Sequence, residues 1–249
     1  MLLQSISISE PPFEDYLLDL PSVQYLIDLP YFEFTAPVTC LVGENGAGKS
    51  TLLEAIAVAL RFSPLGGRYD DPDRERAPLR GLARVLKCSL NGNLHRGYFL
   101  RAETHESVLK AANQPKERGG RSHLPIDVDL LSRSHGESVF DVLGEYVDGR
   151  GLYILDEPEA GLSVIRQMAL IAEIHQAAQR GAQFIIATHS PILLAAPGAD
   201  IVELGESGFE KIPFDQAEPV VATRELLDAP EETLSLIHIS ERAGKADRR

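Results

Sequence analysis

The residues with the clearest chemistry lie near position 45, where the chain reads Gly-Glu-Asn-Gly-Ala-Gly-Lys-Ser over residues 43–50. Glycines at this spacing let successive backbone N–H groups turn toward phosphate oxygens. The lysine can reach the outer phosphates, and the serine hydroxyl can ligate Mg²⁺. A glycine-rich turn without a ligand is the alternative. The pattern predicts a triphosphate site formed by Gly43, Glu44, Asn45, Gly46, Ala47, Gly48, Lys49, Ser50 and Thr51.

A second candidate group is the Asp156-Glu157 pair, which directly follows the apolar segment 151–155. A carboxylate at the tip of a strand beside the phosphate loop can supply an oxygen ligand to Mg²⁺, and we assign this task to Asp156. The adjacent Glu157 is then placed to orient or deprotonate an attacking water. By itself such a pair is also typical of a solvated turn. The loop at 43–50 favours the catalytic interpretation.

Two further segments carry candidate phosphate contacts. His189 follows the apolar segment 183–188, and its imidazole can donate a hydrogen bond to a γ-phosphate near neutral pH. Ser134 and Gly136 precede a helix-like stretch at 138–147, where a hydroxyl and free N–H groups would form a second anion site. The alternatives are a histidine and a serine that only cap the helices that follow them.

The elements needed to position these groups are short apolar strands followed by helices. Segments 38–42, 151–155 and 183–188 are continuous apolar runs of strand length, and 51–60 reads as the helix that leaves the phosphate loop. Such runs predict an α/β fold with a mainly parallel sheet. Residues 163–180 predict another helix, whose apolar stripe we expect to face the core: Ile165, Met168, Ala169, Ile171, Ala172 and Ile174.

The remaining segments complete the expected architecture. Residues 3–9 alternate like an exposed strand, with Leu3 and Ile6 on opposite faces, and an antiparallel β-layer is expected from the N-terminal region. Residues 83–90 and 97–102 are expected to be strands, 10–30 irregular, and 199–204 with 209–214 a hairpin. We expect one domain over 1–249, with a small helical subdomain at about 104–147 and a flexible tail at 241–249.

Bulk composition limits the class of protein. The 249 residues include 37 acidic and 24 basic ones, a formal net charge of −13, which argues against a constitutively basic nucleic-acid surface but allows a local basic patch. The two cysteines, Cys40 and Cys88, lie in apolar runs and are expected to be reduced core thiols. No apolar run approaches the ~20 residues of a membrane helix. With no signal-peptide pattern evident, the expected location is cytoplasmic and no integral membrane segment is expected.

Four stretches together resemble the ABC-type ATPases: the loop at 43–50 and the segments that carry Asp156-Glu157, His189 and Ser134. The resemblance runs from about residue 38 to 228, and within the family it is to the stand-alone, SMC-like branch that includes predicted bacterial ATPases. Ser134-His-Gly-Glu137 lies where that family has its signature Ser-Gly-Gly-Gln. Ser163 stands where many members have an aspartate. Glu103 also lies near the place where the family usually has a glutamine. With these departures from the family pattern, the chain looks less like the transporter members of the family.

The resemblance implies an ABC-type P-loop fold, Mg²⁺-dependent ATP hydrolysis, and catalytic roles for Lys49, Glu157 and His189. It places Glu103 near Mg²⁺ and the attacking water. It also implies that Ser134, Gly136 and Glu137 complete the ATP site of a second subunit, so the chain would form an ATP-dependent homodimer acting on an unknown protein or nucleic acid.

Two other functions stay open, and the sequence does not identify the residue that stacks on the nucleotide base. The first is a slow-turnover, nucleotide-gated binding module of a defence or toxin–antitoxin pair, and the second is a detached ATPase subunit of a membrane transporter. Candidates to stack on the base are Tyr25, Tyr31 and Phe34, with a core role as the alternative for each.

Overall fold

The computed structural model describes residues 1–12, 14–69, 78–101, 104, 147, 149–205, 208–231 and 233. The predicted helical subdomain at 104–147 lies outside this part of the chain except for Thr104 and Val147, and the predicted tail at 241–249 lies wholly outside it.

A seven-stranded, mainly parallel sheet forms the centre of the molecule, in the order β10-β9-β3-β8-β7-β6-β4. Its five inner strands are parallel, and β4 and β10 pair antiparallel at the two edges. Every residue of β3, β7 and β8 is buried, as expected for strands covered on both faces. The strands are β3 (Val38–Val42), β4 (Gly67–Arg68), β6 (Gly97–Arg101), β7 (Leu152–Asp156), β8 (Gln183–Ala187), β9 (Asp200–Gly205) and β10 (Gly208–Ile212). The expected α/β class and the expected hairpin, β9–β10, are confirmed.

A second, three-stranded antiparallel sheet has the order β2-β1-β5, which confirms the expected N-terminal β-layer. Its strands are β1 (Leu3–Ile8), β2 (Phe32–Glu33) and β5 (Leu86–Leu90). The predicted alternation of β1 is wrong at its start, because Leu3 and Ile6 are both buried. The pairing of β1 with β5 shifts register between Leu3 and Ser5, and such a shift brings two residues that strict alternation would separate onto the same face.

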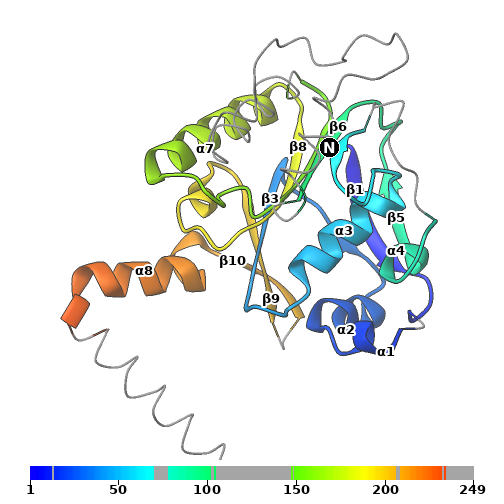
Figure 1. Cartoon of the computed structure of the whole chain (residues 1–249), viewed down its shortest axis with the longest axis horizontal. Helices are drawn as coiled ribbons and strands as arrows, with labels where there is room; N and C mark the ends of the chain where they lie inside the picture. Colours follow the sequence, from blue (N-terminus) through cyan, green and yellow to red (C-terminus); the bar gives the residue numbers. More distant parts are fainter. Residues whose placement is uncertain are drawn as a thin grey trace, which may run out of the picture.

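Helices lie on both sides of the central sheet (Figure 1), with α7 on one side and α2 and α3 on the other. The short helix α4 packs against α3, and α8 extends away from the sheet with only Val220 buried. Two apolar cores follow from this arrangement: Leu41, Ile154 and Ile185 point to the α3 side, whereas Tyr153, Leu155 and Phe184 point to the α7 side. The helices are α1 (Asp15–Leu18), α2 (Pro21–Asp28), α3 (Lys49–Ala59), α4 (Leu82–Val85), α7 (Val164–Gln179) and α8 (Glu218–Asp228), with 3-10 turns η2 (Leu193–Ala195) and η3 (Phe214–Gln216).

Two predicted segments differ from the structure. Residues 10–30 are not irregular but contain α1 and α2, the latter starting at Pro21, where a proline is favoured because the first helical N–H needs no partner within the helix. The strand expected from residue 83 begins only at Leu86, after the short helix α4.

The expected buried stripe of α7 is confirmed for Ile174 but wrong for Ile165, Met168, Ala169 and Ala172, which are exposed. The side chains of Ile165 and Met168 are 73% and 55% exposed, whereas the buried residues of the helix are Leu170, Ile174 and Ala177. At about 100° of rotation per residue, Leu170 and Ile174 share one face and Ile165 and Met168 lie nearly opposite. The apolar residues therefore form two stripes, and only one of them faces the sheet.

The side chain of Gln183, at the start of β8, ties the two sheets together. Its Nε2 donates to the Leu3 carbonyl at 2.8 Å, and its Oε1 accepts from the backbone N–H groups of Leu3 at 2.7 Å and Leu2 at 2.9 Å. Gln183 is buried, so these bonds fix β1 against the parallel sheet. No helix in the described ranges is long and apolar enough to cross a membrane.

Candidate nucleotide site

The glycine-rich loop leaves β3 and enters α3 with its backbone in conformations that glycine favours. Gly43, Gly46 and Gly48 have φ angles of 137°, 88° and 91°. A Cβ at Gly43 would lie 2.3 Å from the Leu204 carbonyl oxygen, and one at Gly48 would lie 2.2 Å from Ser22 Oγ. The loop therefore needs these two glycines both for its backbone and for close packing against α2 and β9.

Lys49 is the first residue of α3, and its side chain folds back over the loop. Its Nζ donates to the carbonyl oxygens of Gly43 at 2.7 Å and Glu44 at 2.9 Å, and the residue is only 6% exposed. Burial lowers the pKa of Lys49, while the charges of Glu157 and Asp156 oppose that shift. A buried ammonium thus lies at the loop within the electrostatic reach of two carboxylates.

Ser50 and Asp156 lie in direct contact. The Ser50 hydroxyl donates to Asp156 Oδ1 at 2.9 Å, and Asp156 is the last residue of β7 and 7% exposed. A hydroxyl beside a carboxylate is a hard-oxygen donor set that fits Mg²⁺, which keeps several waters and takes few protein ligands. The described residues contain no group of three or more His, Cys, Asp or Glu side chains that could hold a metal.

Glu157 leaves the strand in an unusual backbone conformation. Its φ is 48°, in the left-handed region that non-glycine residues rarely adopt, and its backbone N–H donates to the Ala187 carbonyl at 2.9 Å. Such local strain concentrates at functional sites. The turn leaves the Glu157 side chain exposed while Asp156 beside it is buried, so two adjacent carboxylates have different access to solvent.

His189 lies two residues beyond the end of β8 and is partly exposed. Its backbone N–H donates to Glu159 Oε1 at 2.8 Å, and the Thr188 hydroxyl donates to the same oxygen at 2.6 Å. Glu159 is not among the site residues that the sequence predicts; the sequence offers it only as an alternative base should Glu157 not fill that role. An acidic residue in a short turn beside a strand end was the available signal, but it gives no hint of which strand lies next to it.

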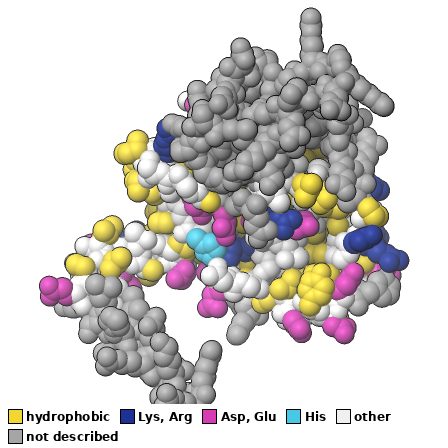
Figure 2. Space-filling model, in the orientation of Figure 1, with side chains coloured by type: hydrophobic (Ala, Val, Ile, Leu, Met, Phe, Trp, Pro, Cys, Tyr) yellow, Lys and Arg dark blue, Asp and Glu magenta, His cyan; other side chains and the backbone are white. Residues whose placement is uncertain are grey.

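The structure thus brings Lys49, Ser50, Asp156 and Glu157 to the carboxyl ends of β3 and β7, with His189 following β8 between them. Their catalytic roles stay predictions. The other predicted site residues lie outside the described residues: Glu103, Ser134, Gly136 and Glu137. Figure 2 shows acidic, basic and histidine side chains gathered near the middle of the face in view.

The three aromatic candidates for base stacking have different surroundings. Phe34 is buried with its ring centroid 5.2 Å from that of Phe32, and Tyr25 packs against Phe209 at 5.3 Å. These two side chains therefore contribute to the core, as their alternative interpretation held. Tyr31 is exposed.

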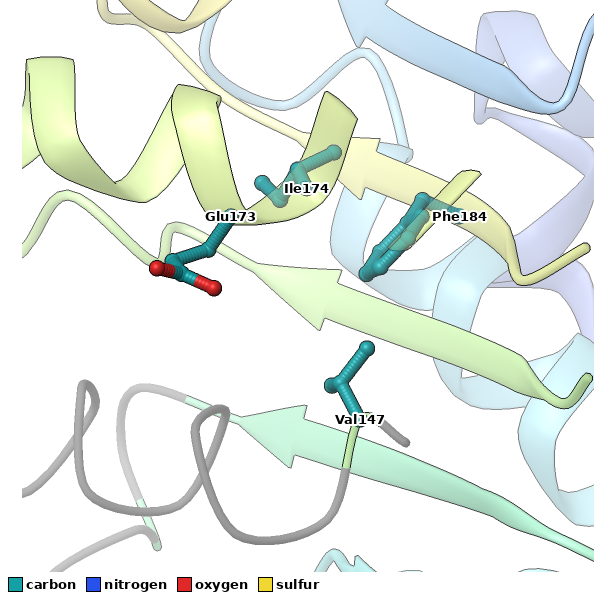
Figure 3. A pocket seen from close by; sticks show the side chains of 4 residues that line it. All are labelled: Val147, Glu173, Ile174 and Phe184. Carbon is teal, nitrogen blue, oxygen red and sulfur yellow. The ribbon is translucent and has the colours of Figure 1, made fainter. Parts of the chain in front are cut away.

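A small hollow lies apart from these groups, against α7 (Figure 3). It is lined by Val147, Glu173, Ile174 and Phe184. Phe184 is the second residue of β8, so the hollow lies near the start of that strand, whereas the phosphate loop lies at the opposite, carboxyl end. The hollow does not belong to the nucleotide site.

Two family models match the chain. Residues 24–85 match one described as "AAA domain", and residues 82–195 match one described as "AAA domain, putative AbiEii toxin, Type IV TA system".

Curated relatives cover most of the same region. The chain is 32% identical over 164 residues to the cytochrome c biogenesis ATP-binding export protein CcmA of Rhodopseudomonas palustris, covering 63% of this chain and 80% of CcmA. It is 30% identical over 195 residues to the hemin import ATP-binding protein HmuV of Gloeobacter violaceus, covering 69% of each. A solved ATP-binding subunit of an ABC transporter superposes with a TM-score of 0.48 at 20% identity, covering 86% of this chain and 91% of that one.

Proposed function

The chain belongs to the ABC-type P-loop ATPases, and from this premise we propose that it hydrolyses ATP with Mg²⁺ at residues 43–51 and forms an ATP-dependent homodimer that acts on a macromolecular partner. One observation carries the assignment of the site. Ser50 and Asp156, 106 residues apart, are joined by a hydrogen bond of 2.9 Å, and the charge of Asp156 acts on the Lys49 ammonium.

ATP binding is assigned to the loop at 43–51 and to Asp156. The backbone N–H groups of residues 45–51 and the Lys49 ammonium hold the phosphates, because both are donors fixed at the N-terminus of α3. Ser50 Oγ and the Asp156 carboxylate would hold Mg²⁺. When bound there, Mg²⁺ would neutralise charge on the β- and γ-phosphates.

Hydrolysis is assigned to Glu157 and His189. Glu157 takes a proton from water as the water oxygen attacks the γ-phosphorus, and the bond to the β–γ bridging oxygen breaks to release ADP and phosphate. His189 donates a hydrogen bond to the γ-phosphate. The exposed position of Glu157 next to the buried Asp156 supports this division of roles.

Dimerisation is proposed from the family and from the charge of ATP. Ser134, Gly136 and Glu137 of one subunit would complete the site formed by Lys49 of the other, in a two-fold arrangement. The γ-phosphate adds negative charge that a second helix N-terminus can neutralise from the open side. Loss of that phosphate removes the bridge, so the dimer should form with ATP and loosen with ADP.

The test uses Lys49→Ala and Glu157→Gln, with the exposed Lys87→Ala and Glu210→Gln as matched controls. Lys49→Ala should lose ATP binding, or at least hydrolysis, without unfolding the chain. Glu157→Gln should bind ATP, turn over about 10²- to 10⁴-fold more slowly, and form a dimer by light scattering that dissociates when ADP replaces ATP. Parental turnover in either variant would reject the assignment of the site. A Glu157→Gln protein that stays monomeric with saturating Mg-ATP would reject the dimer.

Two other functions are each favoured by one comparison. The match of residues 82–195 to a family model with a toxin–antitoxin description favours a nucleotide-gated binding module with slow turnover. The names of the export and import relatives favour a detached transporter ATPase subunit. A pull-down with Glu157→Gln and ATP separates these two functions, since it should retain an antitoxin-like protein in the first case and a membrane protein in the second.

A further inference from the structure

A closed ring of hydrogen bonds joins the turn after β7 to the end of β8. The Thr188 hydroxyl donates to Glu159 Oε1 at 2.6 Å and accepts from the Ser190 N–H at 2.9 Å. The Ser190 hydroxyl donates to Gln167 Oε1 at 2.6 Å, and Gln167 Nε2 donates to the Leu162 carbonyl at 3.1 Å. The Leu162 N–H donates to the Glu159 carbonyl at 2.9 Å and closes the ring. Displacing one member therefore strains its neighbours.

Glu159 is the member of this ring that also holds His189. Its Oε1 accepts from both the Thr188 hydroxyl and the His189 N–H, while its Oε2 is buried and has no hydrogen-bond partner within the described ranges. A carboxylate that accepts two short hydrogen bonds forms strong, charge-assisted contacts. The carboxylate also lies close enough to β3 for its charge to contribute to the raised pKa of Cys40.

We propose that Glu159 is a positioning residue that fixes the backbone of His189 relative to the Asp156–Glu157 turn. The inference rests on the proposed hydrolysis of ATP and deepens it. In addition to the strand pairing of β7 with β8, hydrogen bonds link the turn after β7 to the end of β8. The Glu157 N–H donates to the Ala187 carbonyl, and Thr188 and His189 both donate to Glu159 Oε1. The side-chain link is the one that reaches His189 itself, and misplacement by about 1 Å can cost on the order of 10²-fold in rate.

This role differs from that of a general base. Oε1 of Glu159 is already engaged by two donors and Oε2 is buried, whereas the Glu157 side chain is exposed at the same edge of the sheet. A glutamine at position 159 keeps an oxygen that can accept both hydrogen bonds but cannot take a proton from water. The two roles therefore predict opposite results for the same substitution.

The experiment compares steady-state ATP hydrolysis of the full chain with Glu159→Ala, Glu159→Gln and a control, Glu173→Ala, on the exposed side of α7. Glu159→Ala should lower kcat by about 10- to 100-fold, with KM for ATP changed by less than about threefold. Glu159→Gln should recover kcat to within about threefold of the parent, and Glu173→Ala should match the parent. Parental kcat in a folded Glu159→Ala protein would overturn the proposal. So would a Glu159→Gln variant as slow as Glu159→Ala.

A second pair of variants covers the case in which Glu159→Ala does not fold. Thr188→Val keeps the side-chain shape but removes both the donor to Glu159 Oε1 and the acceptor of the Ser190 N–H. We expect kcat to fall with KM unchanged, and Thr188→Ser, which keeps the hydroxyl, should restore it. Parental kcat in Thr188→Val overturns the role of the contact. Lys49→Ala separates this result from the proposed function, because hydrolysis that survives Lys49→Ala rejects the ATP site itself. If Lys49→Ala is inactive while Glu159→Ala has parental kcat, only the positioning role is rejected.

Discussion

The Ser50 hydroxyl donates a hydrogen bond to Asp156 Oδ1 at 2.9 Å, although 106 residues separate the two in the chain. Ser50 follows β3 and Asp156 ends β7, and these two strands are not neighbours because β8 lies between them. The contact exists because α3, which begins at the loop after β3, packs across the sheet against β8 and β7. Ser50 lies in the first turn of this helix, where its hydroxyl meets the Asp156 carboxylate at the end of β7, and the two groups form a donor set that fits Mg²⁺.

Asp156→Asn should separate the charge of this residue from its hydrogen bond. The amide oxygen can still accept from Ser50, so the fold should be kept, but the loss of negative charge weakens an Mg²⁺ ligand. We expect turnover to fall by about 10- to 100-fold and half-maximal activity to require more Mg²⁺. Magnesium titrations of ATP hydrolysis check this, with the exposed Asp215→Asn as control. An unchanged magnesium dependence would remove Asp156 from the metal site.

Glu157→Gly tests the cost of the left-handed backbone at this residue, whose φ is 48°. The left-handed conformation costs a non-glycine residue about 1–2 kcal/mol, and glycine loses somewhat more entropy on folding. The glycine variant should therefore be more stable than Glu157→Ala by up to about 1 kcal/mol, while both lose hydrolysis. Urea unfolding of the two variants measures the difference. A glycine variant less stable than the alanine variant would show that the conformation is not strained.

Gln183→Leu should destabilise the protein by at least about 2 kcal/mol. The leucine fills similar space but leaves the buried Leu3 carbonyl and the N–H groups of Leu2 and Leu3 without the bonds that Gln183 makes. Gln176→Leu, on an exposed position of α7, is the control and should change the free energy of unfolding by less than about 0.5 kcal/mol. Urea denaturation gives both values. Equal stabilities of the two variants would mean that the sheets are held together without this side chain.

Cys40 should make the protein less stable at high pH. Burial, helped by the charge of Glu159, raises the pKa of the Cys40 thiol from 9.0 to about 12. The folded state therefore keeps a proton that the unfolded state releases, so the free energy of unfolding should be unaffected below pH 9 and should fall as the pH rises from 9 toward 12.

Cys40→Ala should reduce this alkaline slope, as measured by urea unfolding at several pH values above and below 9.0. Cys88, whose pKa burial also raises to about 12, contributes a similar slope, and Cys88→Ala serves as the comparison. If the slope of Cys40→Ala equals that of the parent, the thiol does not titrate differently in the two states.

Features set by short stretches of sequence were predicted well. The backbone of the loop at 43–50 needs glycines at fixed positions, and the structure gives three of them positive φ angles. The apolar runs that became β3, β7 and β8 are buried on both faces, a requirement that excludes polar residues and so is visible in the sequence. Their parallel arrangement follows from the helices that alternate with them.

Features that depend on which segments meet were decided by the tertiary structure. The sequence of α7 offers two apolar stripes, and the sheet selects Leu170 and Ile174 over Ile165 and Met168 because a helix can turn only one face to a core. The register shift of β1 depends on its pairing with β5. Glu159 is informative only once β8 lies beside β7 and brings Thr188 and His189 to its carboxylate. A local pattern fixes the conformation of a segment, whereas a hydrogen bond between distant segments depends on the order of strands in the sheet.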